Sequence, residues 1–301
     1  MNLAPIALFT YKKLAPLKAA IEALKKNNLA KDSNLIVFSD GPKKASDIGQ
    51  IKKVRDYIET ISGFKSVVHN FSDSNKGLAV SIVGGVSRIL KQHETVIVLE
   101  DDLLTSPNFL DFMNESLNHY KNNNKIISIS GYTPPIKNLK NYSFDNYFTQ
   151  RASSWGWATY REQWLRVDWD VTDYSQFEKN TIAKKKFNNM GSDMTFMLAK
   201  QMKGSIDSWA IRWCYHQFRN DLYTVFPMVS KINNIGFTEG ATHTKGNSEM
   251  ARFATPIDTK NSTSFKFNND ISLETSFIKQ FIVPYSIKTR ILYKLKGIVG
   301  K

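Results

Sequence analysis

Short apolar runs alternate with longer segments of helical periodicity in the first half of the chain. The longer segments repeat apolar residues at spacings of three and four, which is typical of helices with one buried face. The runs themselves are almost continuously apolar, as in strands that are buried on both faces. This alternation predicts βα units and a mainly parallel sheet. The predicted strands are 5–11, 34–41, 65–71 and 95–101, with further strands at 125–131 and 222–227.

Polar residues follow three of these predicted strands at the point where each strand ends. They occupy positions 10–13, 39–41 and 100–102. Ligands of open α/β sheets bind at the carboxyl ends of the strands, so we expect these three groups to line one crevice. A helix is predicted after the third group, with Ser106 as its N-cap and Pro107 at its first position.

Three consecutive acids, Glu100, Asp101 and Asp102, end a predicted buried strand. A buried carboxylate is unfavourable unless a cation or strong hydrogen-bond donors accompany it. Adjacent carboxylates suit Mg²⁺ or Mn²⁺, which proteins hold by one or two carboxylates together with phosphate oxygens and waters. In an extended chain Glu100 and Asp102 point to the same side, so one of these two is expected to bind the metal. Solvated acids or helix caps are the structural alternative.

The composition describes a globular protein with an anionic partner. The 301 residues are 42% hydrophobic, and 41 Lys and Arg outnumber 27 Asp and Glu, for a net charge of +14. Such an excess suits a nucleic acid, a membrane surface or a phosphorylated substrate. The sequence has no nucleic-acid-binding motif, and its basic residues are diffuse until the C-terminal segment, so no nucleic-acid partner is expected.

The sequence indicates neither a signal peptide nor a transmembrane helix. No basic region or small-residue cleavage site accompanies the first apolar run, and no segment approaches about 18 uninterrupted apolar residues. The single cysteine, Cys214, excludes an internal disulfide and is expected to be buried. We therefore expect a cytoplasmic protein.

Six ordered blocks of the sequence carry a family resemblance. They are NKGLAVSIVGGVSRIL (75–90), VIVLEDDLLTSPNFLDFMNESLNHY (96–120), SISGY (128–132), RASSWGWATYREQW (151–164), IDSWAIRW (206–213) and NIGFTEGATH (234–243). Together they resemble bacterial sugar-nucleotide-dependent glycosyltransferases of the GT-A fold and, more distantly, the animal N-acetylglucosaminyltransferase I group.

The resemblance covers roughly residues 4–245. It implies an α/β fold, a GT-A nucleotide-sugar-binding sandwich with a central, mainly parallel sheet. The catalytic domain is expected at 1–245. A connecting segment and a basic helical tail are expected at 246–301.

The resemblance also implies roles for the residues of the predicted crevice. Asp102 is expected to bind Mn²⁺ or Mg²⁺, which bridges the two phosphates of a nucleotide sugar. Glu100 and Asp101 are expected to contact the donor sugar, the ribose or metal-bound waters. Asp40 matches an aspartate that accepts a hydrogen bond from uracil, which favours UDP as the nucleotide.

Thr10 and Lys13 complete the expected donor site. Lys13 stands where the family has an arginine at the diphosphate, which keeps the charge and loses the bidentate fork. The sequence alone does not separate the role of Lys12 from that of Lys13.

Three further residues have both a functional and a structural interpretation. Asp207 resembles the catalytic base of inverting family members, but it can also be the N-cap of the helix that follows. His243 is a second metal ligand or phosphate donor by resemblance, and a surface histidine otherwise. Trp157, like its neighbour Trp155, either stacks on a sugar ring or packs in the interior.

These assignments predict a metal-dependent, inverting glycosyltransferase of the hexosyl or N-acetylhexosaminyl class, acting in bacterial surface polysaccharide synthesis. The metal and Lys13 are expected to stabilise the departing diphosphate, and Asp207 to accept the proton of the acceptor hydroxyl. A nucleotidyltransferase is an alternative, although its glycine-rich loop after the first strand is absent. A non-catalytic adaptor that binds sugar nucleotides is another.

Residues 285–301 combine apolar residues at helical spacing with basic residues and contain no acid. Such a helix can lie among the headgroups of an anionic membrane. A lipid-linked saccharide acceptor would give this contact a purpose. The prediction is therefore a peripheral protein at the inner face of the cell membrane. The alternative is that the apolar face of this helix packs on the catalytic domain.

Overall fold

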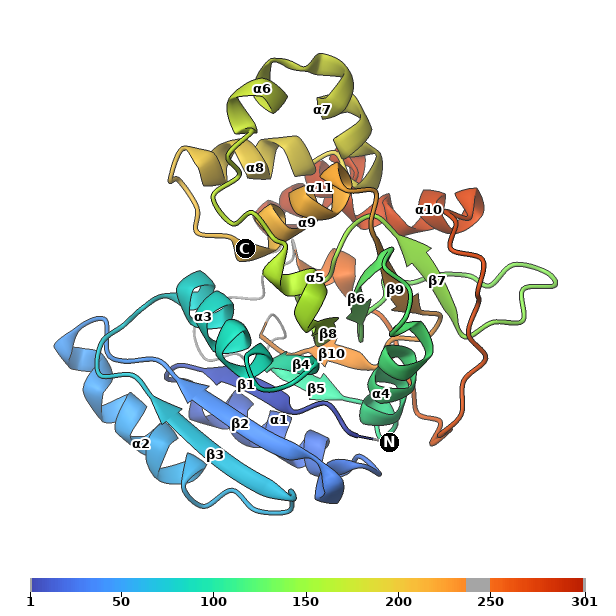
Figure 1. Cartoon of the computed structure of the whole chain (residues 1–301). Helices are drawn as coiled ribbons and strands as arrows, with labels where there is room; N and C mark the ends of the chain where they lie inside the picture. Colours follow the sequence, from blue (N-terminus) through green and yellow to red (C-terminus); the bar gives the residue numbers. More distant parts are fainter. Residues whose placement is uncertain (1, 237–249, 300–301) are drawn as a thin grey trace.

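The computed structural model describes residues 2–236 and 250–299, and its strands form one large mixed sheet and one small ribbon (Figure 1). Within these residues the large sheet has eight strands in the order β3-β2-β1-β4-β8-β6-β9-β7, and β10 pairs with β5. The strands are β1 (Ile6–Thr10), β2 (Asn34–Ser39), β3 (Ser66–Phe71), β4 (Thr95–Glu100), β5 (Leu103–Thr105), β6 (Ile126–Ser130), β7 (Asn146–Thr149), β8 (Trp157–Tyr160), β9 (Tyr223–Pro227) and β10 (Ile232–Asn234).

The first four strands of the large sheet are parallel. β1 pairs with β2 on one side and with β4 on the other, and β2 pairs with β3. The register places Thr10 opposite Ser39 and Phe9 opposite Glu100, so the carboxyl ends of these strands lie at one edge. This confirms the four strands predicted in the first half and the mainly parallel sheet.

The second half of the sheet is mixed. β8 runs antiparallel between β4 and β6, β6 is parallel to β9, and β7 is antiparallel to β9. β6 and β9 correspond to the two further strands that the sequence predicts. The other strands of this half, together with β5 and β10, have three or four residues each and show no clear apolar pattern.

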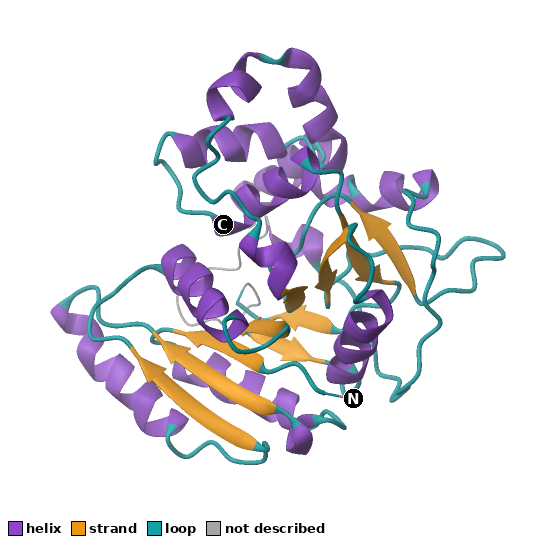
Figure 2. Ribbon diagram, in the orientation of Figure 1, coloured by secondary structure: helices purple, strands orange, loops and turns teal. Residues whose placement is uncertain are grey.

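Helices cover both faces of the sheet and give three layers (Figure 2). One face packs against α1 (Leu14–Lys25), α2 (Ile48–Ile58) and α4 (Phe109–Tyr120), which bury aliphatic and aromatic side chains on it. The other face packs against α3 (Leu78–Leu90), α5 (Arg161–Leu165) and α9 (Trp209–Arg219). Burial of these apolar faces on a two-sided sheet holds the strand ends in fixed positions.

The helix after the acids begins later than the sequence predicts. α4 starts at Phe109 with Asn108 as its N-cap residue. Ser106 is occupied elsewhere, because its backbone N–H donates to the Lys231 carbonyl at 2.8 Å and its hydroxyl donates to the Asn108 side chain at 2.9 Å. Pairing with the chain around β10 therefore takes residue 106 out of the helix.

A group of short helices forms a separate layer at the top of Figure 1. α6 (Tyr174–Lys179), α7 (Thr181–Phe187) and α8 (Met194–Met202) pack with α9 around buried aromatic and aliphatic side chains, and the buried Cys214 lies in this cluster. The 3-10 helices of the described chain are η1 (Ala30–Asp32), η2 (Ala45–Asp47), η3 (Asn188–Met190), η4 (Met250–Phe253) and η5 (Val283–Tyr285).

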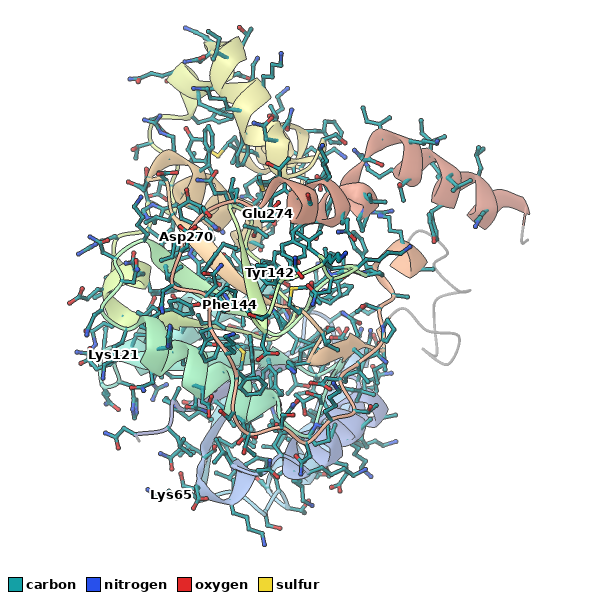
Figure 3. The ribbon with its side chains drawn as sticks, turned by 90° about the vertical axis from the view of Figure 1, so that its right-hand side faces the viewer. Lys65, Lys121, Tyr142, Phe144, Asp270 and Glu274 are labelled. Carbon is teal, nitrogen blue, oxygen red and sulfur yellow. The ribbon has the colours of Figure 1, made fainter. Side chains whose placement is uncertain are left out.

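The C-terminal segment packs on the far end of the sheet before it leaves the body of the molecule. α10 (Thr275–Phe281) buries Phe277 and Phe281 against Tyr147 and Phe226. α11 (Ile287–Val299) then extends outward, as Figure 3 shows. Across the described chain, every helix is too short or too polar to cross a bilayer.

Candidate active site

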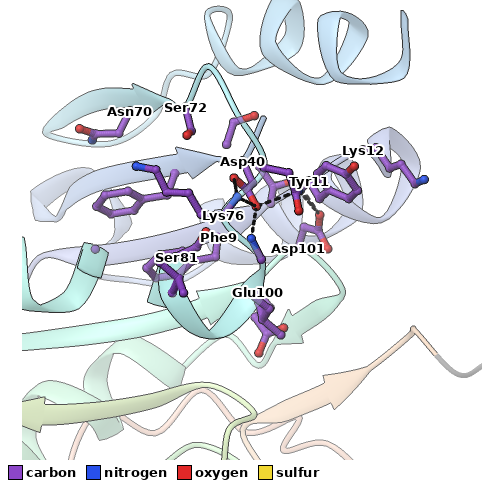
Figure 4. A pocket seen from close by; sticks show the side chains of 18 of the residues that line it. Phe9, Tyr11, Lys12, Asp40, Asn70, Ser72, Lys76, Ser81, Glu100 and Asp101 are labelled. Carbon is purple, nitrogen blue, oxygen red and sulfur yellow. Dashed lines mark hydrogen bonds between the residues drawn. The ribbon is translucent and has the colours of Figure 1, made fainter. Parts of the chain in front are cut away.

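A cleft of about 660 Å³ lies at the carboxyl edge of the parallel strands (Figure 4). This volume falls within the usual range of ligand pockets. The ends of β1, β2, β3 and β4 form one side, and α3 with the loop before it forms the other. The cleft brings together six residues that the sequence assigns to donor and metal binding. They are Thr10, Lys13, Asp40, Glu100, Asp101 and Asp102.

The acidic triplet lines the cleft and forms no ion pair with the described residues. Asp101 Oδ2 accepts hydrogen bonds from the Thr10 hydroxyl at 2.6 Å and from the Tyr11 N–H at 3.3 Å. The Glu100 side chain makes no hydrogen bond or ion pair with the described residues. Burial, together with the neighbouring acids, raises the pKa of Glu100 to about 8. Burial also raises the pKa of Asp101 to about 6 and the pKa of Asp102 above its usual range.

The two neighbouring lysines are distinguished by their partners. Lys12 forms an ion pair with Asp47 at 2.8 Å, and the Tyr11 hydroxyl donates to the same carboxylate at 2.9 Å. Lys13 lines the cleft and forms no ion pair within the described chain, and its charge opposes the rise in pKa of Asp101 and Asp102. Lys13 is therefore the lysine that faces the acidic triplet.

Asp40 is held by the loop that precedes α3, as the dashed lines in Figure 4 indicate. Its Oδ1 accepts from the N–H of Gly41 and the N–H of Lys76, each at 2.9 Å. Its Oδ2 accepts from the side-chain amide of Asn75 and the N–H of Gly77, each at 3.0 Å. None of these partners has a role predicted from the sequence, although Asn75, Lys76 and Gly77 belong to the first block of the resemblance.

Asp207 lies at the rim of the cleft. The N-cap of α9 is Ser208, whose hydroxyl accepts from the Ile211 N–H at 3.4 Å, so the capping interpretation of Asp207 is wrong. The side chain of Asp207 is 58% exposed, and its carboxylate lies 3.9 Å from Arg212 Nη2. It does not line the cleft itself, but Gly77 does, and a Cβ on Gly77 would lie 3.6 Å from Asp207 Oδ2.

Trp157 lies in the core, away from the cleft. It is fully buried, and its ring centroid lies 5.5 Å from Trp164, 4.9 Å from Trp209 and 4.5 Å from Trp213. A residue of β8 whose side chain faces α3 and α9 has no exposed ring face to offer a sugar. The packing interpretation therefore holds for Trp157, and the predicted sugar contact does not.

The surroundings of Asp102 suit a metal that also takes oxygen ligands from a substrate. His243 lies outside the described residues, and residues 2–236 and 250–299 contain no group of three His, Cys, Asp or Glu side chains placed to hold a metal. Gly236 approaches the Asp102 carboxylate so closely that a Cβ there would clash with it. Mg²⁺ and Mn²⁺ need only one or two carboxylates when phosphates and waters complete the shell, so Asp102 fits such an ion.

Comparison with protein-family models and with curated proteins found no match. One similar solved structure is the mannosyltransferase PcManGT from Pyrobaculum calidifontis in complex with GDP-Man and Mn²⁺, with a TM-score of 0.34 and 10% identity over 56% of this chain and 49% of that one.

Two structures of S. aureus TarS are also similar. One has a TM-score of 0.35 and 11% identity over 55% of this chain and 30% of that chain. The other, TarS 1-349, has a TM-score of 0.40 and 9% identity over 76% of this chain and 59% of that chain. The chain thus spans about half or less of two of the three structures. Such low TM-scores and identities assign neither a substrate nor a reaction to it.

Proposed function

We propose that this chain is a metal-dependent, inverting glycosyltransferase that moves a sugar from a nucleoside-diphosphate donor to a saccharide acceptor. The observation that carries the proposal is that unpaired acidic and unpaired basic side chains line the same cleft. Glu100, Asp101 and Asp102 share the cleft with Lys13 and Lys76, and none of these side chains forms an ion pair within the described chain. A diphosphate that carries a divalent metal satisfies both sets of charges, because the metal takes the carboxylates and the lysines take the phosphates.

The donor would bind with its diphosphate between Asp102 and these lysines. A bound Mn²⁺ or Mg²⁺ supplies charge neutralisation for the departing phosphates. Lys13 adds a point charge on the same side, and Thr10 holds Asp101 so that the acidic edge keeps its shape. The hexosyl or N-acetylhexosaminyl nature of the sugar and the preference for UDP remain predictions of the sequence.

Asp207 is the proposed catalytic base. In a direct displacement the acceptor oxygen bonds to the anomeric carbon, the bond from that carbon to the phosphate oxygen breaks, and the hydroxyl proton passes to a carboxylate. Asp207 stands at the rim beside Gly77, where an acceptor hydroxyl can approach from solvent. Because the attack comes from the face opposite the diphosphate, the anomeric configuration inverts.

The test is the product released when the purified chain meets a panel of sugar nucleotides and a saccharide acceptor with Mn²⁺. A glycosyltransferase releases a nucleoside diphosphate, and chelation by EDTA stops the release. Release of pyrophosphate instead would identify the nucleotidyltransferase alternative. Donor binding without any release would identify an adaptor, and either outcome would reject the proposal.

A lipid-linked acceptor of surface polysaccharide synthesis is the finer part of the proposal, with α11 as the membrane contact. Four apolar side chains of α11 are between 48% and 62% exposed. Basic residues flank them, so the helix suits an anionic bilayer. The four residues are Ile287, Ile291, Leu292 and Leu295.

Liposome flotation tests this membrane contact. The double variant Ile291→Asp with Leu295→Asp should lose flotation with anionic vesicles, and neutral vesicles should bind neither chain. Phe196→Asp is the matched control, because Phe196 is 55% exposed on α8. Equal flotation of the wild type and the double variant would reject the proposed membrane contact. It would not bear on the proposed transfer reaction.

A further inference from the structure

The carboxylate of Asp40 has no free acceptor site. A carboxylate offers about four lone pairs, and four donors occupy them at 2.9 to 3.0 Å. A nucleobase N–H could bind Asp40 only by displacing one of these donors. Two of them are backbone amides of the loop before α3, those of Lys76 and Gly77, so the displacement would also disturb the wall of the cleft.

Asp40 holds the segment of the cleft wall that would face the diphosphate of the proposed donor. Its bonds to the N–H groups of Lys76 and Gly77 set the start of α3, where Gly77 has a φ of +79°. Lys76 and Gly77 both line the cleft. From the other side, Arg55 donates to the carbonyl oxygens of Asp40 at 3.4 Å and Ser72 at 2.6 Å, which fixes Asp40 itself.

Asn70 carries a side-chain amide that lines the cleft and has no hydrogen-bond partner among the described residues. It lies near the end of β3, in register with Phe38 of β2, and both residues line the cleft. Figure 4 shows Asn70 on the wall of the cleft. Its side chain makes no hydrogen bond with the described residues. Phe38 stacks on Phe9 with ring centroids 4.8 Å apart, so an apolar floor lies beside the amide.

Close packing by α3 keeps this floor in place. Gly85 lies against both rings, because a Cβ there would come within 2.8 Å of Phe9 and 3.2 Å of Phe38. A primary amide both donates and accepts, and an aromatic surface beside it favours a flat ring. Asn70 therefore has the chemistry that reads the edge of a base, and Asp40 does not.

We infer that Asn70 is the side chain that reads the nucleobase, and that Asp40 is a positioning residue which holds Lys76 and the start of α3 for the diphosphate. This inference rests on the proposed function, since it needs a nucleotide in this cleft. It also changes the expected donor. An amide can pair with the edges of several bases, so the preference for uridine that was predicted from Asp40 loses its basis.

Calorimetry with UDP, GDP and inorganic pyrophosphate, each with Mg²⁺, separates the two roles because pyrophosphate has no base. Asp40→Asn should weaken UDP, GDP and pyrophosphate by a similar factor, on the order of tenfold, as hydrogen bonds to a charged group are lost. Asn70→Ala should weaken the nucleotides by a factor on the order of ten and leave pyrophosphate unchanged. Val68→Ala is the matched control, an exposed residue on the same side of β3 that does not line the cleft.

Each alternative gives a different pattern. If Asp40→Asn weakens only the nucleotides, Asp40 reads the base and the inference is wrong. If Asn70→Ala leaves the affinity for all three ligands unchanged, Asn70 does not bind the nucleobase.

Should Asp40→Asn fail to fold, Asn75→Ala replaces it, since this variant frees one Asp40 lone pair while loosening the same loop. It should weaken pyrophosphate too if Asp40 is a positioning residue, whereas unchanged pyrophosphate affinity would overturn that role. A wild-type chain that binds none of the three ligands would instead reject the proposed function.

Discussion

Carboxylates with little exposure occur in two regions of the molecule, and their pKa values shift in opposite directions. At the edge of the parallel strands, burial raises the pKa of Glu100, Asp101 and Asp102 above the usual values. In the second half, burial also opposes ionisation of Asp193 and Asp258. There, however, a neighbouring cation more than compensates and lowers both pKa values.

The difference lies in the cation. Arg151 donates to both oxygens of Asp193, at 2.8 and 2.9 Å, and Tyr285 covers the guanidinium at 3.6 Å from its ring centroid. Lys231 pairs with Asp258 in the interior. Each of these acids has its cation within the chain, so removing one partner would leave the other charge buried and unpaired. The acidic triplet forms no ion pair with the described residues, which is why we propose that an external cation binds there.

The largest effect is expected from Asp102→Asn. This change removes the proposed metal ligand, so Mn²⁺-dependent donor binding and turnover should be lost. It also removes a partly buried charge that forms no ion pair with the described residues and whose pKa burial raises, so the thermal unfolding temperature should stay unchanged or rise. Calorimetry with and without Mn²⁺, together with circular dichroism, measures both. Donor affinity that depends on Mn²⁺ as before would show that Asp102 is not the ligand.

Asp207→Asn should act on turnover alone. Loss of a general base lowers the rate by a factor of roughly 10² to 10⁴, while donor affinity persists because Asp207 lies outside the cleft lining. Asp221→Asn, an exposed acid just beyond α9, is the control and should leave turnover unchanged. Near-normal turnover of Asp207→Asn would refute the base role. A product that retains the anomeric configuration by NMR would refute the inverting mechanism.

Asp193→Asn should instead cost stability. Breaking a buried ion pair by removing one partner costs about 3 to 5 kcal/mol, because the other charge stays buried. Urea unfolding should show this loss, with donor affinity unchanged in the folded protein. Replacing both partners, with Arg151→Met and Asp193→Leu together, should recover much of the stability. A loss in Asp193→Asn no greater than in Asp32→Asn, an exposed acid of η1, would contradict the structural role of the pair.

The parallel half of the fold could be predicted because its central strands, β1 and β4, are buried on both faces and appear as unbroken apolar runs. Strands such as β5 and β10 could not, since they have three residues each and exist through pairing with one another. The later start of α4 has the same cause, because Ser106 is held by the backbone of Lys231.

Much of the candidate site followed from the order of residues at strand ends, and the rest depends on long-range contacts. The lysine that faces the acids could not be chosen until Asp47 was seen to bind Lys12. The saturation of Asp40 depends on Asn75, which is 35 residues away in the sequence. Trp157 has the composition of a sugar-stacking residue, and only its burial among other tryptophans excludes that role.

The smallest expected effect is a pH dependence that distinguishes the paired acids from the unpaired ones. Asp193 has a folded-state pKa below the ordinary value of 3.8, because Arg151 outweighs burial. The unfolded chain therefore takes up this proton at a higher pH than the folded chain does. The stability that the pair contributes is fully present above the unfolded pKa and is lost as the pH falls through the folded pKa.

The side-chain amide in the variant Asp193→Asn cannot titrate, so the stability of the variant lacks the pH dependence that Asp193 contributes. The stability gap between the wild type and Asp193→Asn should be constant at neutral and mildly acidic pH and should narrow once the pH falls below about 4. Asp258 and the acidic triplet are the same in both chains and cancel in the difference. Urea unfolding of the two proteins at a series of pH values measures the gap. If it stays constant down to the lowest pH at which both chains fold, the folded pKa of Asp193 is not lowered, and the contrast between the two regions fails.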